Sequence, residues 1–316
     1  MDVFGGLLDG PRARGAFALR VLMDPPWSVR IEDEAPLSLV SVVKGQAWVI
    51  PQQDPPVRLD PGGVAIMRGP EPYSFADDPA TPTRVVIHAG QHCTTPDGED
   101  LAQAMDLGVR SWGNNPAGST SMLIGTYERH SEIGQQLLTV LPQLVVLPAD
   151  GWDSPLLPML SDEIVKDEPG QEAVLDRLLD RLLDLLVVAV LRAWLSRHQE
   201  EAPGWYRARR DPVVGRALRM LQNSPDQPWT VATLAAESGV SRAALARRFA
   251  EVVGEPPMAF LTAWRLALAA DLLREPDTTI ATVAQQVGYS SAFALSAAFK
   301  RVRGVTPRDH RAAVAQ

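Results

Sequence analysis

The feature that most constrains this chain of 316 residues is an internal repeat in its last third. Residues 230–253 and 279–302 share one pattern: a short apolar helix, a glycine, a serine, and a second helix with apolar residues four apart. Gly239 and Gly288 supply the left-handed turn between the two helices of each copy. A repeated unit of this kind predicts two helix-turn-helix units that fold alike.

The second helix of each copy has one apolar face and one open face. In the first copy, Ser241 caps the helix and the pair Leu245 and Phe249 turns it inward. Leu295 and Phe299 have the same spacing in the second copy. The face that can enter a groove of DNA carries Arg242, Ala243, Ala246 and Arg247 in the first copy.

A longer helix connects the two copies. The sequences GEPP at 254–257 and GVTP at 304–307 each stop one helix with Gly and start the next with Pro. Residues 258–274 have apolar side chains at helical spacing and predict one helix between the units. Two units held about 34 Å apart can enter successive major grooves on one face of the duplex.

These motifs resemble the DNA-binding domain of the AraC/XylS family of transcription regulators, over residues 210–316. The matched patterns are S-x-x-x-L-x-R-x-F-x-x-x-x-G-x-x-P, W-R-L-x-x-A-x-x-L-L, I-x-x-V-A-x-x-V-G-Y and F-K-R-x-x-G-x-x-P, all between Ser241 and Pro307. The resemblance implies a transcription factor that binds double-stranded promoter or operator DNA through helices beginning at Ser241 and Ser290. It implies these base-facing positions: Ala243, Ala246 and Arg247 in the first helix, and Ala292, Phe293 and Ala297 in the second.

Two positions depart from the family pattern. Ala297 stands where members often have Arg, and His310 replaces the usual Tyr of the closing helix. We therefore expect the first unit to carry most direct base readout, through Arg247. The second unit is expected to work through DNA shape and through phosphate contacts, with Lys300 and Arg301 as candidates. The alternative is a helical bundle that binds protein.

The charge of the chain is divided unevenly. From Gly204 onward there are 15 Lys and Arg against 9 Asp and Glu, a net of +6, while the remainder has 15 against 29, a net of −14. The basic part carries the repeat, as neutralisation of DNA phosphates requires. An acidic part joined to a basic part indicates a sensor joined to a DNA reader.

Length and segment composition predict two domains. We expect a sensing and dimerisation domain over 1–200, a charged linker with Pro and Gly over 201–211, and the DNA-binding domain over 212–316. No segment has the pattern of a membrane span or signal peptide, and the single Cys93 excludes an internal disulfide and fits a reducing compartment. The sequence thus predicts a cytoplasmic protein.

The first hundred residues predict strands. Short alternating or β-branched runs between Pro and Gly turns lie at 18–23, 27–31, 37–43, 46–50, 57–59, 64–67 and 84–88. The runs VVKGQAWVI and VRLDPGGVAIMRG resemble the two-part core of a cupin. We expect an α+β protein with an N-terminal cupin-like β-barrel and flanking helices, followed by an all-α domain of two helix-turn-helix units joined by a linker helix.

The metal-binding residues of cupins are missing from their usual places. Ser38, Leu39 and Val40 precede VVKG, and Tyr73 stands in EPYSF where metal-binding cupins often have His. We therefore expect a regulator and no enzyme. Two alternatives stay open: a metal-dependent cupin enzyme fused to a DNA-binding tail, and a regulator without a ligand, controlled by its abundance.

One group of residues suits a metal. His88, His92 and Cys93 lie within IHAGQHC, and His130 follows in YERH. Imidazole and thiolate are ligands of Zn²⁺, which makes zinc the candidate cofactor and a metal or redox signal a candidate effector. The spacing matches no standard zinc pattern, and the alternative is a packed cysteine beside a solvated loop.

A small-molecule effector is the other candidate signal. Residues 111–149 predict a polar connection, a strand at 122–127 and a short helix ending before Pro142, which would close one mouth of the barrel. A ligand between this segment and the sheet would have as apolar walls Trp27, Trp48, Tyr73 and Trp112. The alternative is that these aromatic residues belong to the core.

The longest predicted helix covers residues 171–198. Leucines form one stripe, and beyond Asp184 the helix is apolar almost all round. A helix that is apolar on two sides needs two partners, which we expect to be the core of the sensor and the same helix of a second subunit, in a homodimer. The alternative is burial within a single chain. RNA polymerase is a further candidate partner, and Arg181, Asp184 and Arg192 argue against a membrane span.

Overall fold

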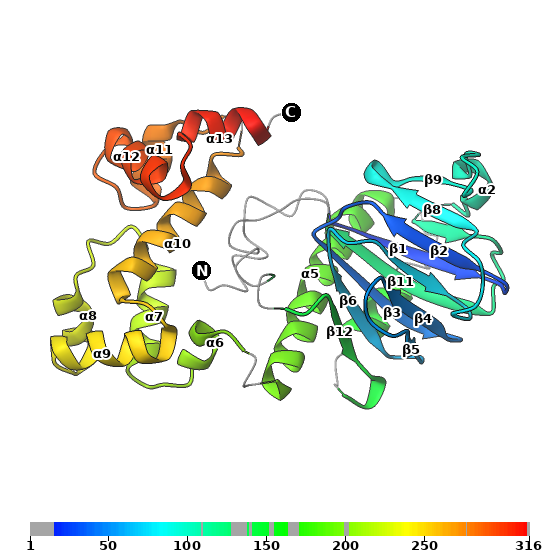
Figure 1. The fold of residues 1–316 in the computed structure, drawn as a ribbon, viewed down its shortest axis with the longest axis horizontal. Coiled ribbons are helices and arrows are strands. Elements are labelled where there is room, and N and C mark those ends of the chain that lie inside the picture. The colour runs from blue at the N-terminus through cyan, green and yellow to red at the C-terminus, as the bar shows by residue number, and fades with distance from the viewer. Residues whose placement is uncertain are drawn as a thin grey trace. The chain divides into compact units, whose positions relative to one another are not determined.

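The chain consists of a strand-rich unit and a helical unit, which confirms the expected mixed fold class (Figure 1). The computed structural model describes residues 16–108, 110–127, 138, 141–151, 155–163, 171–198, 202–275 and 277–314. The strand-rich unit contains the described residues up to Arg197 except residue 138, and the helical unit contains residue 138 and the described residues from His198 onward.

The first unit contains two six-stranded sheets. One sheet has the order β10 (Ser111–Gly113), β1 (Ala16–Met23), β11 (Thr120–Tyr127), β3 (Leu37–Lys44), β6 (Val64–Arg68) and β12 (Leu144–Leu147). The other has the order β5 (Val57–Leu59), β4 (Ala47–Pro51), β7 (Tyr73–Ala76), β2 (Ser28–Glu32), β8 (Val85–His88) and β9 (His92–Thr94). The described strands do not pair from one sheet to the other, so the cupin-like unit consists of two separate sheets, and no closed barrel is formed by the described strands.

A shared core joins the two sheets. Val42 and Met67 of the first sheet belong to the same buried cluster as Val49 and Phe75 of the second. Strand β4 alternates between buried and half-buried residues, as a strand with one face on a core should. The two sheets thus pack face to face.

All of the strands predicted from the sequence are present, and four further strands are not among those predictions. The additional strands β7, β9, β10 and β12 have three or four residues each. Strand β10 lies in the stretch expected to be a polar connection, where Trp112 pairs in parallel with Val21. Strand β12 follows Pro142, whereas the helix expected before that proline falls almost entirely outside the described residues.

The long predicted helix is confirmed as α5 (Gln171–Arg197). Leu183, Leu186 and Val190 on it are fully buried. A Cβ on Gly125 of β11 would lie 2.3 Å from the Leu183 side chain, so the helix packs closely on the outer face of the first sheet. The shorter helices of this unit are α2 (Ala102–Met105) and α4 (Leu156–Glu163), with 3-10 turns η1 (Ala89–Gln91) and η2 (Ala149–Gly151). In the part of the chain that the structure describes, no helix is long and apolar enough to cross a membrane.

The second unit is entirely helical. Its helices are α6 (Gly204–Ala208), α7 (Val214–Asn223), α8 (Val231–Glu237), α9 (Arg242–Val253), α10 (Pro257–Leu272), α11 (Ile280–Gln286), α12 (Ala292–Arg303) and α13 (Pro307–Val314). Helix α10 runs from the group α7 to α9 to the group α11 to α13 (Figure 1). This is the linker helix expected at 258–274, and its 16 residues span about 24 Å.

Part of the stretch expected to be a linker belongs to this helical unit. Helix α6 lies within 201–211, and Trp205 and Ala208 on it are buried. A Cβ on Gly204 would lie 2.7 Å from the backbone oxygen of Val252, so α6 packs directly on the end of α9. The stretch is charged overall, but its apolar residues Trp205 and Ala208 are buried, and this burial explains the packing.

Helix ends follow the residues predicted for them, with one correction. The hydroxyl of Ser241 accepts from the Ala244 amide at the start of α9, and Gly254 and Gly304 end α9 and α12 with φ of 98° and 76°. The cap of α12 is Ser291, whose hydroxyl accepts from the Ala294 amide, and not Ser290 as expected. Helix α12 therefore begins one residue later than expected.

Candidate nucleic-acid interface and ligand cavity

Helix α9 presents the face that the sequence predicts. Leu245 and Phe249 are fully buried in the helical unit, which fixes the rotation of α9 about its axis. The opposite side is therefore turned outward, with Arg242, Ala243 and Arg247 exposed and Ala246 half-buried. Two arginines and two small side chains on an exposed helix face fit the major groove, where Arg reads guanine and Ala permits close approach.

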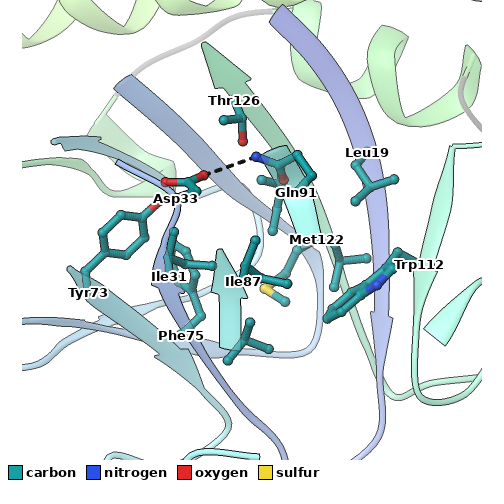
Figure 2. A pocket seen from close by; sticks show the side chains of 13 residues that line it. Leu19, Ile31, Asp33, Tyr73, Phe75, Ile87, Gln91, Trp112, Met122 and Thr126 are labelled. Carbon is teal, nitrogen blue, oxygen red and sulfur yellow. Dashed lines mark hydrogen bonds between the residues drawn. The ribbon is translucent and has the colours of Figure 1, made fainter. Parts of the chain in front are cut away.

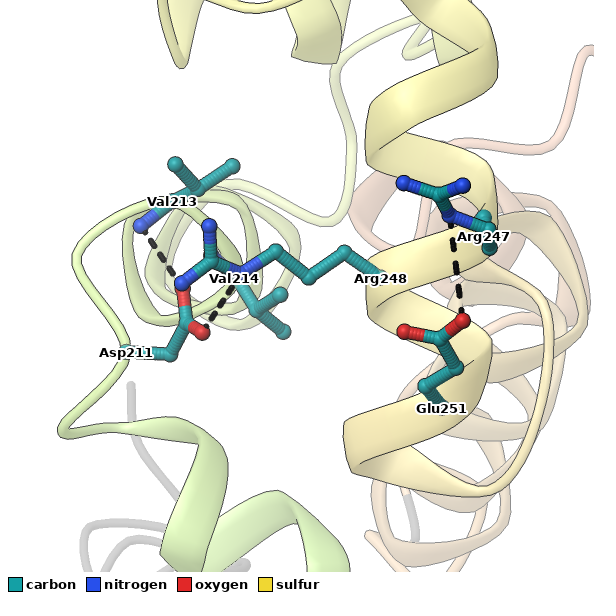
Figure 3. A network of polar contacts seen from close by, with 6 residues as sticks. All are labelled: Asp211, Val213, Val214, Arg247, Arg248 and Glu251. Atoms are coloured by element: carbon teal, nitrogen blue, oxygen red, sulfur yellow. Dashed lines mark hydrogen bonds and ion pairs between the residues drawn. The ribbon is translucent and has the colours of Figure 1, made fainter.

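Adjacent arginines on α9 have different roles (Figure 3). Arg247 Nε lies 3.7 Å from Glu251 Oε1, in a loose ion pair whose side chains are 77% and 63% exposed. Arg248 Nε donates to Asp211 Oδ2 at 2.8 Å, and the other oxygen of that carboxylate accepts from the Val213 and Val214 amides at 2.9 Å. Arg248 thus holds α9 to the start of α7, whereas Arg247 can turn toward a ligand at little cost.

The Asp211 carboxylate is set up to remain charged. Burial alone would raise its pKa, but hydrogen bonds from the Val214 amide, the Arg248 guanidinium and the Val213 amide outweigh that effect and lower the pKa. The interaction between α7 and α9 therefore depends on the ionised form of this residue.

Helix α12 is oriented in the same way by Leu295 and Phe299, which are fully buried. Its open side includes Phe293, which is 83% exposed. The other positions expected to contact DNA are also accessible: Ser290, Ala297, Lys300 and Arg301 are exposed, and Ala292 is half-buried. Both helices thus turn their predicted reading face to solvent.

Arg265 of α10 connects the two helix-turn-helix units. Its Nε donates to the Pro225 carbonyl at 2.7 Å and its Nη2 donates to the Gln227 carbonyl at 2.8 Å, just before α8. Its guanidinium also lies 5.9 Å from the ring centroid of Tyr289, in the turn of the second unit. One side chain therefore contacts both units and favours one separation between them.

The closing helix α13 is held by the residue that departs from the family pattern. His310 Nε2 lies 3.2 Å from the Ala270 carbonyl of α10, and its ring packs edge-on against Phe299 at 5.5 Å. The histidine thus provides a polar contact and an aromatic contact at this junction.

The strand-rich unit contains a cavity of about 220 Å³ between its two sheets (Figure 2). It is lined by Leu19, Val21, Val29, Ile31, Asp33, Tyr73, Phe75, Ile87, Gln91, Trp112, Met122, Ile124 and Thr126. Tyr73 and Trp112, two of the four predicted aromatic walls, lie among these residues. Trp27 is instead part of the core, and Trp48 is not on the lining, because β4 lies outside the cavity.

Three polar side chains gather at one end of this cavity (Figure 2). Gln91 Nε2 donates to Asp33 Oδ2 at 3.3 Å, and the Ala35 amide donates to Asp33 Oδ1 at 3.0 Å. Thr126 is the third. Tyr73 lies on the same wall as Asp33, and burial raises its pKa, so its phenol stays neutral.

Comparisons with known proteins give matches in both the strand-rich part and the helical part of the chain. A cupin family model matches residues 2–196, and a helix-turn-helix domain model matches residues 234–313. A putative AraC-like transcription regulator of Streptomyces lividans is 31% identical over 313 residues, which cover 98% of each chain. The chain belongs to the AraC-like family of transcription regulators.

Another relative of this AraC-like regulator and a similar solved structure are also named as transcription regulators. The regulator MtrA of Neisseria gonorrhoeae is 27% identical over 98% of each chain. Among solved structures, the DNA-binding domain of AdpA, crystallised with a target DNA, is 34% identical and covers 33% of this chain and 92% of its own, with a TM-score of 0.31.

The three candidate zinc ligands that the structure describes in this AraC-like regulator do not converge on one point. His88 and His92 pair across β8 and β9, and their ring centroids lie 6.1 Å apart. His88 Nε2 lies 2.9 Å from Thr94 Oγ1, and His92 Nδ1 lies 3.8 Å from Asp100 Oδ2. His130 lies outside the described residues.

Cys93 points away from these histidines because side chains alternate along a strand. It is buried in the core, and burial raises the pKa of its thiol, partly offset by a hydrogen bond with the Trp112 side chain. Among the described residues no group of three or more His, Cys, Asp or Glu side chains can hold a metal ion.

Three residues of these sites are absent from the sequence prediction. Asp33 and Gln91 are 58 positions apart and meet only in the fold, and Arg265 reaches the carbonyls of a loop about 40 positions earlier. A local signal exists only for Arg265, which lies in the W-R-L pattern of the connecting helix.

Proposed function

We propose that this regulator reads its operator with α9 and α12 together, one helix in each of two successive major grooves. The support is the orientation of both helices: their apolar residues are buried, and every predicted base-facing position is exposed or half-buried. Arg247 is assigned direct readout of a guanine, because its ion pair with Glu251 is loose. Lys300 and Arg301 are assigned to phosphates.

We further propose that the strand-rich unit is a sensor whose cavity binds a small organic effector. The support is a cavity between the sheets with mostly apolar walls and three polar groups at one end, which is the usual make-up of a ligand site. An effector that binds one arrangement of the sensor more tightly shifts the population toward it and changes how the readers are presented. In this account the strand-rich unit has a regulatory and no catalytic role, in line with the relatives it matches.

The proposed assembly is a homodimer formed through α5. Leu185 on this helix is 50% exposed, although the neighbouring Leu186 and Val187 are fully buried. Val188 and Ala189 beside it are half-buried. A second copy of α5 would cover this side of the helix, and the two copies of the chain would bind two operator halves. We place this complex in the cytoplasm, at a promoter where RNA polymerase also binds.

A cavity-filling variant tests the sensor. The substitution Ile87→Phe adds volume to the cavity, and Ile50→Phe makes the same change on β4, outside the lining. Operator affinity of the full chain would be measured by fluorescence anisotropy with and without a small-molecule extract of the source cells. We expect the extract to change the affinity of the wild type and of Ile50→Phe, but not that of Ile87→Phe. An equal response in all three proteins, or in none of them, would argue against a sensor cavity.

A further inference from the structure

We infer that the cavity selects a small apolar amine, whose ammonium group binds the Asp33 carboxylate. This inference rests on the proposed role of the cavity as an effector site. It adds the chemical class of the ligand, which the cavity's size, wall and charge together determine.

The size of the cavity limits the ligand to about one ring and a short chain. Its volume is about 220 Å³. An engineered apolar cavity of about 150 Å³ stays dry and binds benzene, so the present cavity has room for a benzene ring and a few further atoms.

The wall requires an apolar body. Ile31, Phe75 and Ile87 of the second sheet face Met122 of the first across the cavity (Figure 2), and Ile124 of the first sheet also lines it. Water gains few hydrogen bonds against such a wall, and an aliphatic or aromatic body replaces it favourably.

The charge at one end of the cavity requires a donor on the ligand. Among the lining residues that the structure describes, Asp33 is the one carboxylate, and none is Lys, Arg or His. From the described part of the chain this carboxylate accepts two hydrogen bonds, both from neutral amides, at 3.0 Å and 3.3 Å. A carboxylate has about four acceptor positions, which leaves room for a ligand donor, and a charged donor forms the stronger bond. An acidic ligand would be repelled.

The backbone fixes this end of the cavity before a ligand arrives. Glu34, the neighbour of Asp33, has φ of 57°, and Gln91 has φ of 61°. Neither residue is glycine, and each left-handed conformation costs on the order of 1 kcal/mol or more. Such costs concentrate at functional sites, where a rigid group binds its ligand with a smaller loss of entropy.

The test uses three probes with one body: 3-phenylpropylamine, 3-phenylpropanol and 3-phenylpropanoate. Dissociation constants would be measured by calorimetry on the full chain, on Asp33→Asn and on Asp60→Asn, an exposed aspartate outside the cavity. Thermal unfolding without ligand checks that the variants fold. We expect the wild type and Asp60→Asn to bind the amine about tenfold or more tightly than the alcohol, with the acid weakest, and Asp33→Asn to lose this order.

The outcomes separate this inference from the proposed function. Equal binding of amine and alcohol, unchanged by Asp33→Asn, would show a ligand cavity without selection by Asp33 and would overturn the inference alone. The inference alone would also be overturned if none of the three probes bound, while a cell extract still changed the operator affinity of the wild type but not that of Ile87→Phe. Failure of the probes together with no response to extracts would overturn both.

A different observation supports a second inference: α12 reads thymine through its methyl group. Phe293 lies in the first turn of α12 and is 83% exposed, the most exposed large apolar side chain in the described residues. Ala297, one turn later on the same side, is also exposed. In the major groove only thymine presents a methyl group, and Phe and Ala are side chains that contact it. Thus we infer apolar direct readout at this helix, beyond the expected phosphate and shape contacts.

Replacing thymine by deoxyuridine removes only that methyl group. On an operator selected from random DNA, we expect single replacements in the block bound by α12 to weaken binding about threefold to tenfold at one or two positions, and to have no such effect with Phe293→Ala. Replacements in the block bound by α9 serve as the control. An enriched second block that is insensitive to deoxyuridine would overturn this inference, whereas the absence of any second block would overturn the proposed role of α12 itself.

Discussion

The two adjacent arginines of α9 allow a sharp prediction, because the structure gives them opposite roles. Arg247→Ala removes only a loose, exposed ion pair with Glu251, so the free energy of unfolding should change by less than about 0.5 kcal/mol. If Arg247 reads a guanine, the preference for operator over scrambled DNA should fall by about 1–3 kcal/mol, or roughly 5- to 150-fold.

Arg248→Ala is the matched control. It removes the 2.8 Å hydrogen bond to Asp211, whose side chain is only 14% exposed. Because the Arg248 side chain is itself 49% exposed, solvent screening limits the expected loss of stability to about 1 kcal/mol. The folded Arg248→Ala protein should keep the wild-type preference for operator.

The assay measures two quantities for each protein: the midpoint of urea unfolding, and the ratio of dissociation constants for operator and scrambled DNA at one salt concentration. A third variant, Arg247→Lys, keeps the charge but loses the planar guanidinium fork. Its preference for operator over scrambled DNA should therefore also fall. The reasoning would be refuted by an unchanged ratio in Arg247→Ala, or by an equal fall in Arg248→Ala.

Further predictions concern the junction, the salt dependence and the pH dependence. Arg265→Ala removes the contacts that join the two helix-turn-helix units. In fluorescence anisotropy it should weaken binding to the full operator several-fold, but leave unchanged the binding to DNA that contains only the block read by α9. Lys300→Ala should weaken operator and scrambled DNA alike and reduce the slope of log K against log salt by about 1; a change in their ratio would count against a phosphate contact. The folded-state pKa of Asp211 is below its ordinary 3.8, so the stability it contributes is full above that pH and is lost as pH falls through the folded-state value. Asp211→Asn should therefore make urea unfolding of the chain less sensitive to pH between about pH 5 and 3, and an unchanged pH profile would contradict this.

The helical unit could be predicted closely because its signals are local. Glycine at a left-handed turn, serine at a cap and apolar residues four apart each act within one or two helical turns. The one-residue error at Ser290 arose because Ser291 beside it can also cap, and only the fold shows that the Ser291 hydroxyl accepts the Ala294 amide.

The strand-rich unit was predictable in its longer strands and not in its pairing. Strands β9 and β10 have three residues each, too few for an alternating pattern, and they exist because partner strands lie beside them. The arrangement of the candidate zinc ligands was hidden for the same reason. Within a strand, Cys93 must face away from His92, a fact hidden when the segment is read as a loop.

The cavity between the sheets shows that composition alone does not predict which residues line a cavity. Aromatic residues were expected to form its wall, but Trp27 fills the core and aliphatic residues form most of the lining. The charged end depends on Asp33 and Gln91, which come from segments far apart in the chain and meet through sheet packing. No periodicity in either segment points to the other.

The measurement that tests the account most directly is selection of DNA from a random-sequence pool by the full-length protein. In each operator half we expect two enriched blocks with centres about 10–10.5 base pairs apart, one for α9 and one for α12, with the first block lost in Arg247→Ala and the second altered in Phe293→Ala. A single block that is unaffected by Phe293→Ala, or no enrichment at all, would contradict reading by two helices.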